Sequence, residues 1–216
     1  MVIEPISFSG KFALVTGAAQ GIGEAVTRAL VKYGLKVAAL DIQADRLEML
    51  KEELGNDYCI PYSADISDST AVDKIVKQIE DDLGSIDYLV NVAGVIRYQP
   101  VVLLSDMDWE QTFAVNSTGV FNVSRSLARS MISRRAGAIV TVSSNAATIP
   151  RIGMSAYAAS KAAATHFTRC LGLELSYYGI RCNIVSPGST DTPMQQMMWN
   201  NERGRQSVVS GSLKDF

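Results

Sequence analysis

Histidine and cysteine are scarce in this sequence of 216 residues, which holds one histidine and three cysteines. Cys59, Cys170 and Cys182 are far apart in the chain and His166 is the only histidine, so the partners that a zinc site needs are lacking. An odd number of distant cysteines also argues against a disulfide framework and favours free, buried thiols in a reducing compartment. We therefore expect no metal, no disulfide and a cytoplasmic location.

Long apolar runs and an excess of one charge are also absent. No uninterrupted apolar run reaches the roughly 18 residues of a membrane-spanning helix. The N-terminal stretch lacks a charged region followed by a long apolar one, so we expect no signal peptide. The formal net charge is −2, from 20 basic and 22 acidic residues, which gives no electrostatic footprint for nucleic acid. We expect neither a membrane nor a nucleic acid as partner.

The composition is that of a globular protein, with 47% hydrophobic and 19% charged residues, and the length fits a single domain. Short, nearly continuous apolar runs alternate with amphipathic segments, a pattern typical of parallel strands covered on both faces. It predicts an α/β fold with a doubly wound parallel sheet. We predict strands within 11–17, 36–41, 58–65, 86–94, 137–144 and 180–188, and helices over 21–33, 43–54, 68–83, 108–135 and 155–178. Residues 190–216 are polar and only weakly helical in pattern, and we expect a mobile lid there.

A glycine-rich turn, TGAAQGIG, joins the first predicted strand to the first helix. Gly17, Gly21 and Gly23 permit a tight turn and let a pyrophosphate approach the N–H groups at the helix N-terminus. Glycines alone are weak evidence, but the strand before and the helix after them favour a dinucleotide site over a structural turn. Gln20 and Ile22 belong to the same predicted site.

The second predicted strand ends in Asp41, 18 residues after Gly23. A carboxylate at this point can accept hydrogen bonds from both ribose hydroxyls of adenosine and repels a 2′-phosphate. The glycine loop holds no arginine or lysine, so the sequence predicts NAD rather than NADP. Asp41 could also cap the following helix, which is compatible with that role. Ile42 follows it in the predicted site.

Other strand ends supply further candidates, because open α/β sheets bind ligands at the carboxyl ends of their strands. Asp65 ends the third strand, where its carboxylate could meet the adenine amino group, while helix capping by Asp65 or Asp68 is the alternative. The motif NVAG ends the fourth strand, and its small residues would let a ring or ribose lie near the backbone. From these two strand ends we predict cofactor contacts by Asp65, Ile66, Asn91, Ala93 and Gly94.

Tyr157 and Lys161 lie four positions apart in a predicted helix and therefore share one face. An ammonium beside a phenol lowers the tyrosine pKa from about 10, which makes the phenol a usable base near neutral pH. Alone, such a pair could be a surface pair. Ser144, 13 residues before Tyr157, can hydrogen-bond a substrate oxygen. Asn116, unfavourable inside a helix, could hold a water that links Lys161 to solvent.

The motifs T-G-x-x-x-G-I-G, N-x-A-G, Y-x-x-x-K and SPG, with Asn116 and Ser144 in the same order, resemble the short-chain dehydrogenase/reductase family over residues 8–198. The resemblance implies a Rossmann fold, a nicotinamide cofactor and a catalytic tetrad. By this resemblance, Asn116 organises a proton relay and Ser144 positions the substrate. Tyr157 is then the acid/base, and Lys161 holds the nicotinamide ribose and tunes Tyr157.

The same resemblance carries further expectations. It places Pro187, Gly188 and Thr190 beside the nicotinamide. The motif NVAG has Val92 where a second asparagine is commoner in the family. Family members usually continue with another helix and a last parallel strand, so we expect the sheet here to lack that strand and the sequence to be part of a longer protein. Pairing of the long helices across subunits implies a homotetramer.

Within the family, residues 137–163 and 172–199 resemble enzymes of catecholate siderophore synthesis. The implied reaction is the NAD-dependent oxidation of a carboxylated cyclic diol to an aromatic acid. A carboxylated small molecule needs a cation or a set of donors, and Arg97 and Arg151 are the candidates, although either could be a structural arginine. Ser144, Tyr157 and Gln195 are the predicted polar contacts, and Met154 and Trp199 could form apolar walls.

Two alternatives stay open. The first is a 3-oxoacyl-carrier-protein reductase or another short-chain alcohol dehydrogenase. Asp41 argues against a reductase that uses NADPH, and the lack of a basic patch argues against binding of an acidic carrier protein. The second is an inactive cofactor-binding or assembly protein. The complete set of four motif residues favours chemistry, but motifs alone do not show that a site assembles.

Overall fold

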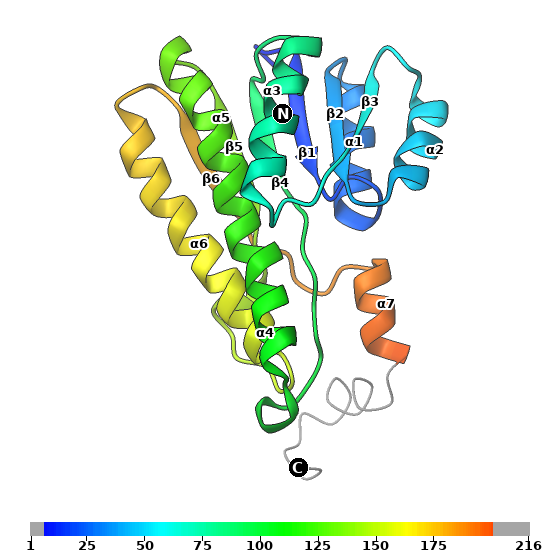
Figure 1. Cartoon of the computed structure of the whole chain (residues 1–216), viewed down its shortest axis with the longest axis vertical. Helices are drawn as coiled ribbons and strands as arrows, with labels where there is room; N and C mark the ends of the chain where they lie inside the picture. The colour runs from blue at the N-terminus through cyan, green and yellow to red at the C-terminus, as the bar shows by residue number, and fades with distance from the viewer. Residues whose placement is uncertain (1–6, 201–216) are drawn as a thin grey trace, which may run out of the picture.

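Six parallel strands form one sheet in the order β3-β2-β1-β4-β5-β6, in a computed structural model that describes residues 7–200 (Figure 1). The order reverses between β1 and β4, which both pair with neighbours in parallel register. The predicted doubly wound sheet is therefore confirmed. The strands are β1 (Phe12–Thr16), β2 (Lys36–Asp41), β3 (Cys59–Ser63), β4 (Tyr88–Asn91), β5 (Ala138–Val142) and β6 (Arg181–Val185).

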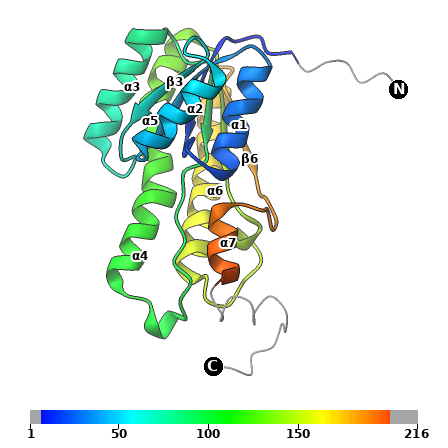
Figure 2. The same ribbon diagram turned by 90° about the vertical axis from the view of Figure 1, so that its right-hand side faces the viewer.

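Helices cover both faces of the sheet, as the edge-on view in Figure 2 shows for α1 on one side and α3 and α5 on the other. Side chains alternate along a strand, so Leu14 of β1 packs into the core with α3, α5 and α6, whereas Ala13 and Val15 pack into the other core. The principal helices are α1 (Gly21–Lys32), α2 (Ala44–Leu54), α3 (Ser69–Leu83), α4 (Asp106–Phe113), α5 (Val120–Arg134), α6 (Ser155–Ser176) and α7 (Pro193–Asn200).

The segment predicted as one helix over 108–135 is divided by a π-helical turn, η2 (Ala114–Gly119), between α4 and α5. Asn116 lies in this turn and is fully buried. Gly119 packs so closely on Ile66 that a Cβ at this position would lie 2.5 Å from Ile66 Cδ1. Single π-helical turns are rare and occur often at functional sites. Two short 3₁₀ turns, η1 (Val101–Leu103) and η3 (Asn145–Ala147), complete the elements.

The segment predicted to be a lid is only weakly helical in its sequence pattern, but it contains a regular helix, α7, directly after Thr192. The Thr192 hydroxyl accepts a hydrogen bond from the backbone N–H of Gln195 at 3.2 Å, and its carbonyl accepts one from Gln196 at 2.9 Å. Residues 201–216 of the predicted lid, and the Trp199 side chain, lie outside the described residues.

Two expectations came from the composition: buried cysteine thiols and the absence of a membrane-spanning helix. Cys59 is buried, but Cys170 is exposed, so the prediction of buried thiols is wrong for Cys170, which sits on the outer face of α6. Within residues 7–200, no helix combines the length and hydrophobicity needed to cross a membrane.

Candidate active site

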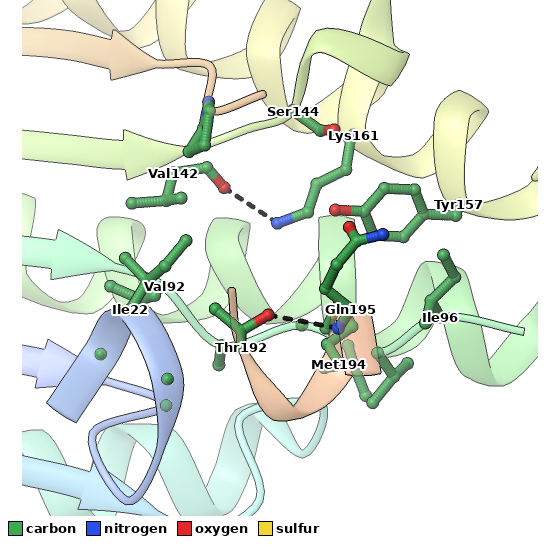
Figure 3. Close-up of a pocket in the computed structure, with 18 of the residues that line it drawn as sticks. Ile22, Val92, Ile96, Val142, Ser144, Tyr157, Lys161, Thr192, Met194 and Gln195 are labelled. Atoms are coloured by element: carbon green, nitrogen blue, oxygen red, sulfur yellow. Dashed lines mark hydrogen bonds between the residues drawn. The ribbon is translucent and has the colours of Figure 1, made fainter. Parts of the chain in front are cut away.

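A cavity of about 740 Å³ lies at the carboxyl ends of the strands and extends from the glycine loop to α7 (Figure 3). The turn after β1, the ends of β2, β4 and β5, the loop after β6 and the first turns of α6 and α7 all contribute to its wall. The cavity therefore occupies the position where open α/β sheets bind ligands, beside the point at which the strand order reverses.

The glycine loop has the backbone conformation that an anion cradle needs. Gly17 and Gly21 have positive φ angles of 68° and 57°, which glycine adopts without strain. A Cβ on Gly23 would lie 1.9 Å from the carbonyl oxygen of Gly17, so no other residue fits there. Gln20, the N-cap of α1, makes no side-chain hydrogen bond to the helix. This arrangement fits a dinucleotide pyrophosphate at the N-terminus of α1.

Asp41 lines the cavity at the end of β2, and its carboxylate is held in place. Oδ2 accepts from the backbone N–H of Ala19 at 3.1 Å, and Oδ1 accepts from that of Gln43 at 3.0 Å. Gln43, not Asp41, is the N-cap of α2. Sequence reasoning missed Arg46, whose Nη1 donates to Gln20 Oε1 at 3.1 Å and places a cation near the loop.

The other strand ends divide into two groups. Asp65, Ile66, Ala93 and Gly94 line the cavity. Asp65 Oδ1 accepts from the N–H and hydroxyl of Ser67, both at 2.8 Å, while Asp68 caps α3. Asn91 is buried, its Nδ2 donates to Ser124 Oγ at 3.0 Å, and it does not line the cavity. The Asn91 side chain therefore joins the sheet to α5, and the structure does not bring it to the cavity with the other predicted cofactor contacts.

Ser144, Tyr157 and Lys161 meet in the cavity between β5 and α6 (Figure 3). Tyr157 is 8% exposed and Lys161 only 4% exposed. The Ser144 hydroxyl lies beside the Tyr157 phenol (Figure 3). The Lys161 ammonium donates to the Val142 carbonyl at 2.8 Å and lies 6.0 Å from the centre of the Tyr157 ring. The structure thus brings the three predicted residues together.

The pKa values of this group follow from burial. Burial raises the pKa of Tyr157, and the hydrogen bond with Ser144 opposes that change. Burial also lowers the pKa of Lys161 from 10.5 to about 8. The prediction that Lys161 lowers the pKa of Tyr157 is wrong for this structure, because desolvation dominates and the ammonium bonds to Val142 rather than to the phenol.

Asn116 does not line the cavity, but its side chain bonds to Val95, which does. Its Oδ1 accepts from the N–H of Val95 at 2.8 Å, and its Nδ2 donates to the Val95 carbonyl at 2.9 Å and to Ser160 Oγ at 3.0 Å. A Cβ on Gly94 would lie 3.2 Å from Asn116 Oδ1 and 3.3 Å from Lys161 Nζ. Asn116 therefore fixes the loop after β4 against α6, and the predicted water contact stays a prediction.

The two candidate arginines differ in position. Arg97 is bound to α4, since its Nε donates to Asp108 Oδ1 at 3.1 Å and its Nη2 to Gln111 Oε1 at 2.8 Å. It does not line the cavity, so the structure does not bring this predicted substrate contact to the site. Arg151 lies in the loop between β5 and α6 and does line the cavity. Of the two candidate arginines, Arg151 is thus the one that lines the cavity, as Lys161 also does.

The wall near Tyr157 is apolar. Figure 3 shows Gln195 directed toward Tyr157, with Met194 and Ile96 beside it. Sequence reasoning included Met154 and Gln195 but missed Tyr98, Met194 and Met198. The four-residue spacing of the two missed methionines on α7 was the available signal. The packed cluster consists of Ile96, Ala146, Met154 and Tyr157, with Tyr98, Ala158, Met194 and Met198 against it.

The remaining predicted cofactor contacts are in the loop after β6. Pro187, Gly188 and Thr190 line the cavity, and the Pro187 carbonyl accepts from the N–H of Asn145 at 3.1 Å. Thr192 lies against the glycine loop, because a Cβ on Gly21 would come within 3.5 Å of it. In the part of the chain that the structure describes, no group of histidine, cysteine, aspartate or glutamate side chains could hold a metal ion.

This fold and site define an oxidoreductase class, and the chain belongs to the short-chain dehydrogenase family, whose sequence profile matches residues 11–203. It is 55% identical over 209 residues to 2,3-dihydro-2,3-dihydroxybenzoate dehydrogenase of Bacillus subtilis (strain 168), covering 96% of this chain and 80% of the relative. The protein of that name from Escherichia coli (strain K12) is 42% identical, covering 98% and 82%. A short-chain dehydrogenase/reductase from Mycobacterium marinum, of solved structure, is 31% identical with a TM-score of 0.86, covering 90% and 78%.

Proposed function

We propose that this chain oxidises 2,3-dihydro-2,3-dihydroxybenzoate to 2,3-dihydroxybenzoate with NAD, as a step of catecholate siderophore synthesis. One observation carries the proposal: a single cavity joins the glycine loop and Asp41 to Tyr157 and Arg151. It thus holds a dinucleotide cradle, a proton acceptor and a cation for a carboxylate. The names of the two relatives at 55% and 42% identity support the same substrate.

The residues divide the chemistry among them. Arg151 binds the substrate carboxylate, and Ser144 hydrogen-bonds the ring hydroxyl that reacts. Tyr157, as phenolate, takes the proton of that hydroxyl. NAD, when bound, supplies the acceptor for the hydride that leaves the same carbon. The ring ketone that results tautomerises to the aromatic diol, which requires no further oxidant.

Lys161 and Asp41 hold the two riboses of the cofactor in this proposal. Lys161 would hold the hydroxyls of the nicotinamide ribose when NAD is bound, and its positive charge on the same helix as Tyr157 would favour the phenolate. Asp41, already fixed by two backbone N–H groups, accepts from the adenosine ribose and repels a 2′-phosphate. We also propose that the enzyme is a cytoplasmic homotetramer, as the family resemblance implies.

The discriminating experiment offers the purified protein three assays: the dihydrodiol acid with NAD, the same acid with NADP, and a 3-oxoacyl thioester with NADPH. We expect rapid formation of NADH and 2,3-dihydroxybenzoate in the first assay and little turnover in the others. Turnover of the thioester alone would favour the carrier-protein reductase. Tight binding of NADH without turnover in any assay would favour a cofactor-binding protein.

A further inference from the structure

Three consecutive residues at the end of β5 contact α6, and the middle one has no role in the function proposed above. The Val142 carbonyl accepts from Lys161 Nζ at 2.8 Å, and the Ser144 hydroxyl lies beside the Tyr157 phenol. Between these two contacts, the buried hydroxyl of Ser143 lies 2.5 Å from the hydroxyl of Thr165 on α6.

Thr165 links this contact back to Lys161. Thr165 Oγ1 donates to the backbone carbonyl of Lys161 at 2.7 Å, and Ser143 Oγ lies 3.3 Å from the same carbonyl. Each hydroxyl has a single proton. The arrangement consistent with the shorter distances therefore has Ser143 donating to Thr165, and Thr165 donating to the carbonyl. Lys161 is bonded at its ammonium to Val142 and at its backbone carbonyl to Thr165, which in turn accepts from Ser143.

We propose that Ser143 and Thr165 are positioning residues, which fix α6 on β5 and so set where Lys161 and Tyr157 lie relative to Ser144. Both hydroxyls are buried and bonded to one another, so neither has to touch the substrate. A displacement of about 1 Å in a reacting group can reduce turnover about a hundredfold. The inference rests on the proposed function, because it takes Tyr157 as the base.

The surroundings of the Lys161 ammonium make its position relative to Tyr157 important. Tyr157, on the same helix, is the titratable group of the described residues that faces it. From the packed elements, β5 contributes the Val142 carbonyl, the loop after β4 contributes Gly94, and the π-helical turn contributes the uncharged Asn116. In the NAD-bound enzyme proposed above, where the ammonium favours the phenolate, a change in the position of the ammonium is therefore expected to change the ionisation of Tyr157.

A second pair of hydroxyls on the same two elements provides a matched control. Thr168 Oγ1 on α6 lies 2.9 Å from Thr141 Oγ1 on β5 and 2.8 Å from the Ala164 carbonyl. Both threonines are buried, but their hydrogen bonds do not involve Lys161, Tyr157 or Ser144. Loss of this pair removes the same kind of contact between β5 and α6 without touching the active site.

The test compares Ser143→Ala/Thr165→Val with Thr141→Val/Thr168→Val. Each variant loses both partners, so no buried hydroxyl is left unpaired. With the dihydrodiol acid and NAD, we expect Ser143→Ala/Thr165→Val to lower kcat about tenfold. Its acidic limb in the pH profile of kcat should move up by about half a pH unit, because a less closely held ammonium favours the phenolate less. The control pair should change kcat by less than about twofold, with an unshifted profile.

Further variants make the outcome decisive. Thr165→Ser keeps the hydroxyl and should restore the parental profile, and Thr165→Val alone replaces the double variant if that variant does not fold. Equal effects of the two pairs, or no shift in either, would overturn the proposal. A parent protein that binds NADH in a fluorescence titration but does not oxidise the dihydrodiol acid would instead overturn the proposed function.

Discussion

Asn116 and Val95 exchange two hydrogen bonds: the side-chain oxygen accepts from the backbone N–H at 2.8 Å, and the side-chain nitrogen donates to the backbone carbonyl at 2.9 Å. The amide thus closes the loop after β4 onto the π-helical turn, and its second proton reaches Ser160 on α6. One buried side chain therefore connects the loop after β4, the π-helical turn and α6, the helix that carries Lys161.

We expect Asn116→Ala to lower both stability and turnover. The substitution leaves the two backbone groups of Val95 and the hydroxyl of Ser160 without these partners, and a buried polar group left unpaired costs about 1–3 kcal/mol. Urea unfolding should show a loss of at least about 2 kcal/mol. Ser117→Ala, which removes a single hydrogen bond to the Ser160 carbonyl, is the control and should show a smaller loss. Equal losses would contradict the central role of Asn116.

The choice of cofactor should depend on Asp41 and Arg46 together. Asp41→Asn keeps an acceptor for the Ala19 N–H but removes the charge that repels a 2′-phosphate. Arg46 already donates a hydrogen bond to Gln20 and so places a cation near the glycine loop. We therefore expect kcat/KM with NADP to rise at least about tenfold, which corresponds to a decrease of about 1.4 kcal/mol in the activation free energy. Adding Arg46→Gln should abolish that gain. If Asp41→Asn prefers NAD as strongly as the parent does, Asp41 does not determine the choice of cofactor.

The two arginines provide a paired test of substrate binding. Arg151→Ala should raise the KM for the dihydrodiol acid about 10- to 100-fold, because a hydrogen bond to a charged group contributes about 1.5–3 kcal/mol. Arg97→Ala should leave KM nearly unchanged and lower stability, since Arg97 joins the loop after β4 to α4. The opposite result, with KM sensitive to Arg97 alone, would place the carboxylate elsewhere.

The extent to which sequence predicted this site follows the range of the interactions involved. The sheet, the glycine loop and the meeting of Ser144, Tyr157 and Lys161 depend on local motifs at strand ends, which a sequence displays directly. The positions of Arg97 and Asn91 depend on partners that are distant in sequence, Asp108 and Ser124. The π-helical turn leaves no periodicity that distinguishes it from a continuous helix.

Lys161 should make stability depend on pH in a defined window. Its pKa falls from 10.5 to about 8 on burial, so the unfolded chain binds the proton more tightly, and folding becomes more favourable as pH rises through that window. The unfolding free energy of the parent minus that of Lys161→Met should therefore increase by up to about 3 kcal/mol between pH 7 and 10. Urea unfolding of both proteins across this range gives the slope, and a flat difference would contradict a buried, destabilised ammonium.

The most direct test of the account is the rate at which the parent and Tyr157→Phe form NADH from 2,3-dihydro-2,3-dihydroxybenzoate, with NADH affinity measured for both. Tyr157 lies at the junction of the cofactor cradle and the apolar wall, and proton transfer by a positioned group contributes about 10²- to 10⁴-fold. We predict that the variant binds NADH as the parent does but turns over at least about a hundredfold more slowly. If Tyr157→Phe turns over as fast as the parent, another group takes the proton, and the assignment of Tyr157 as the base is contradicted.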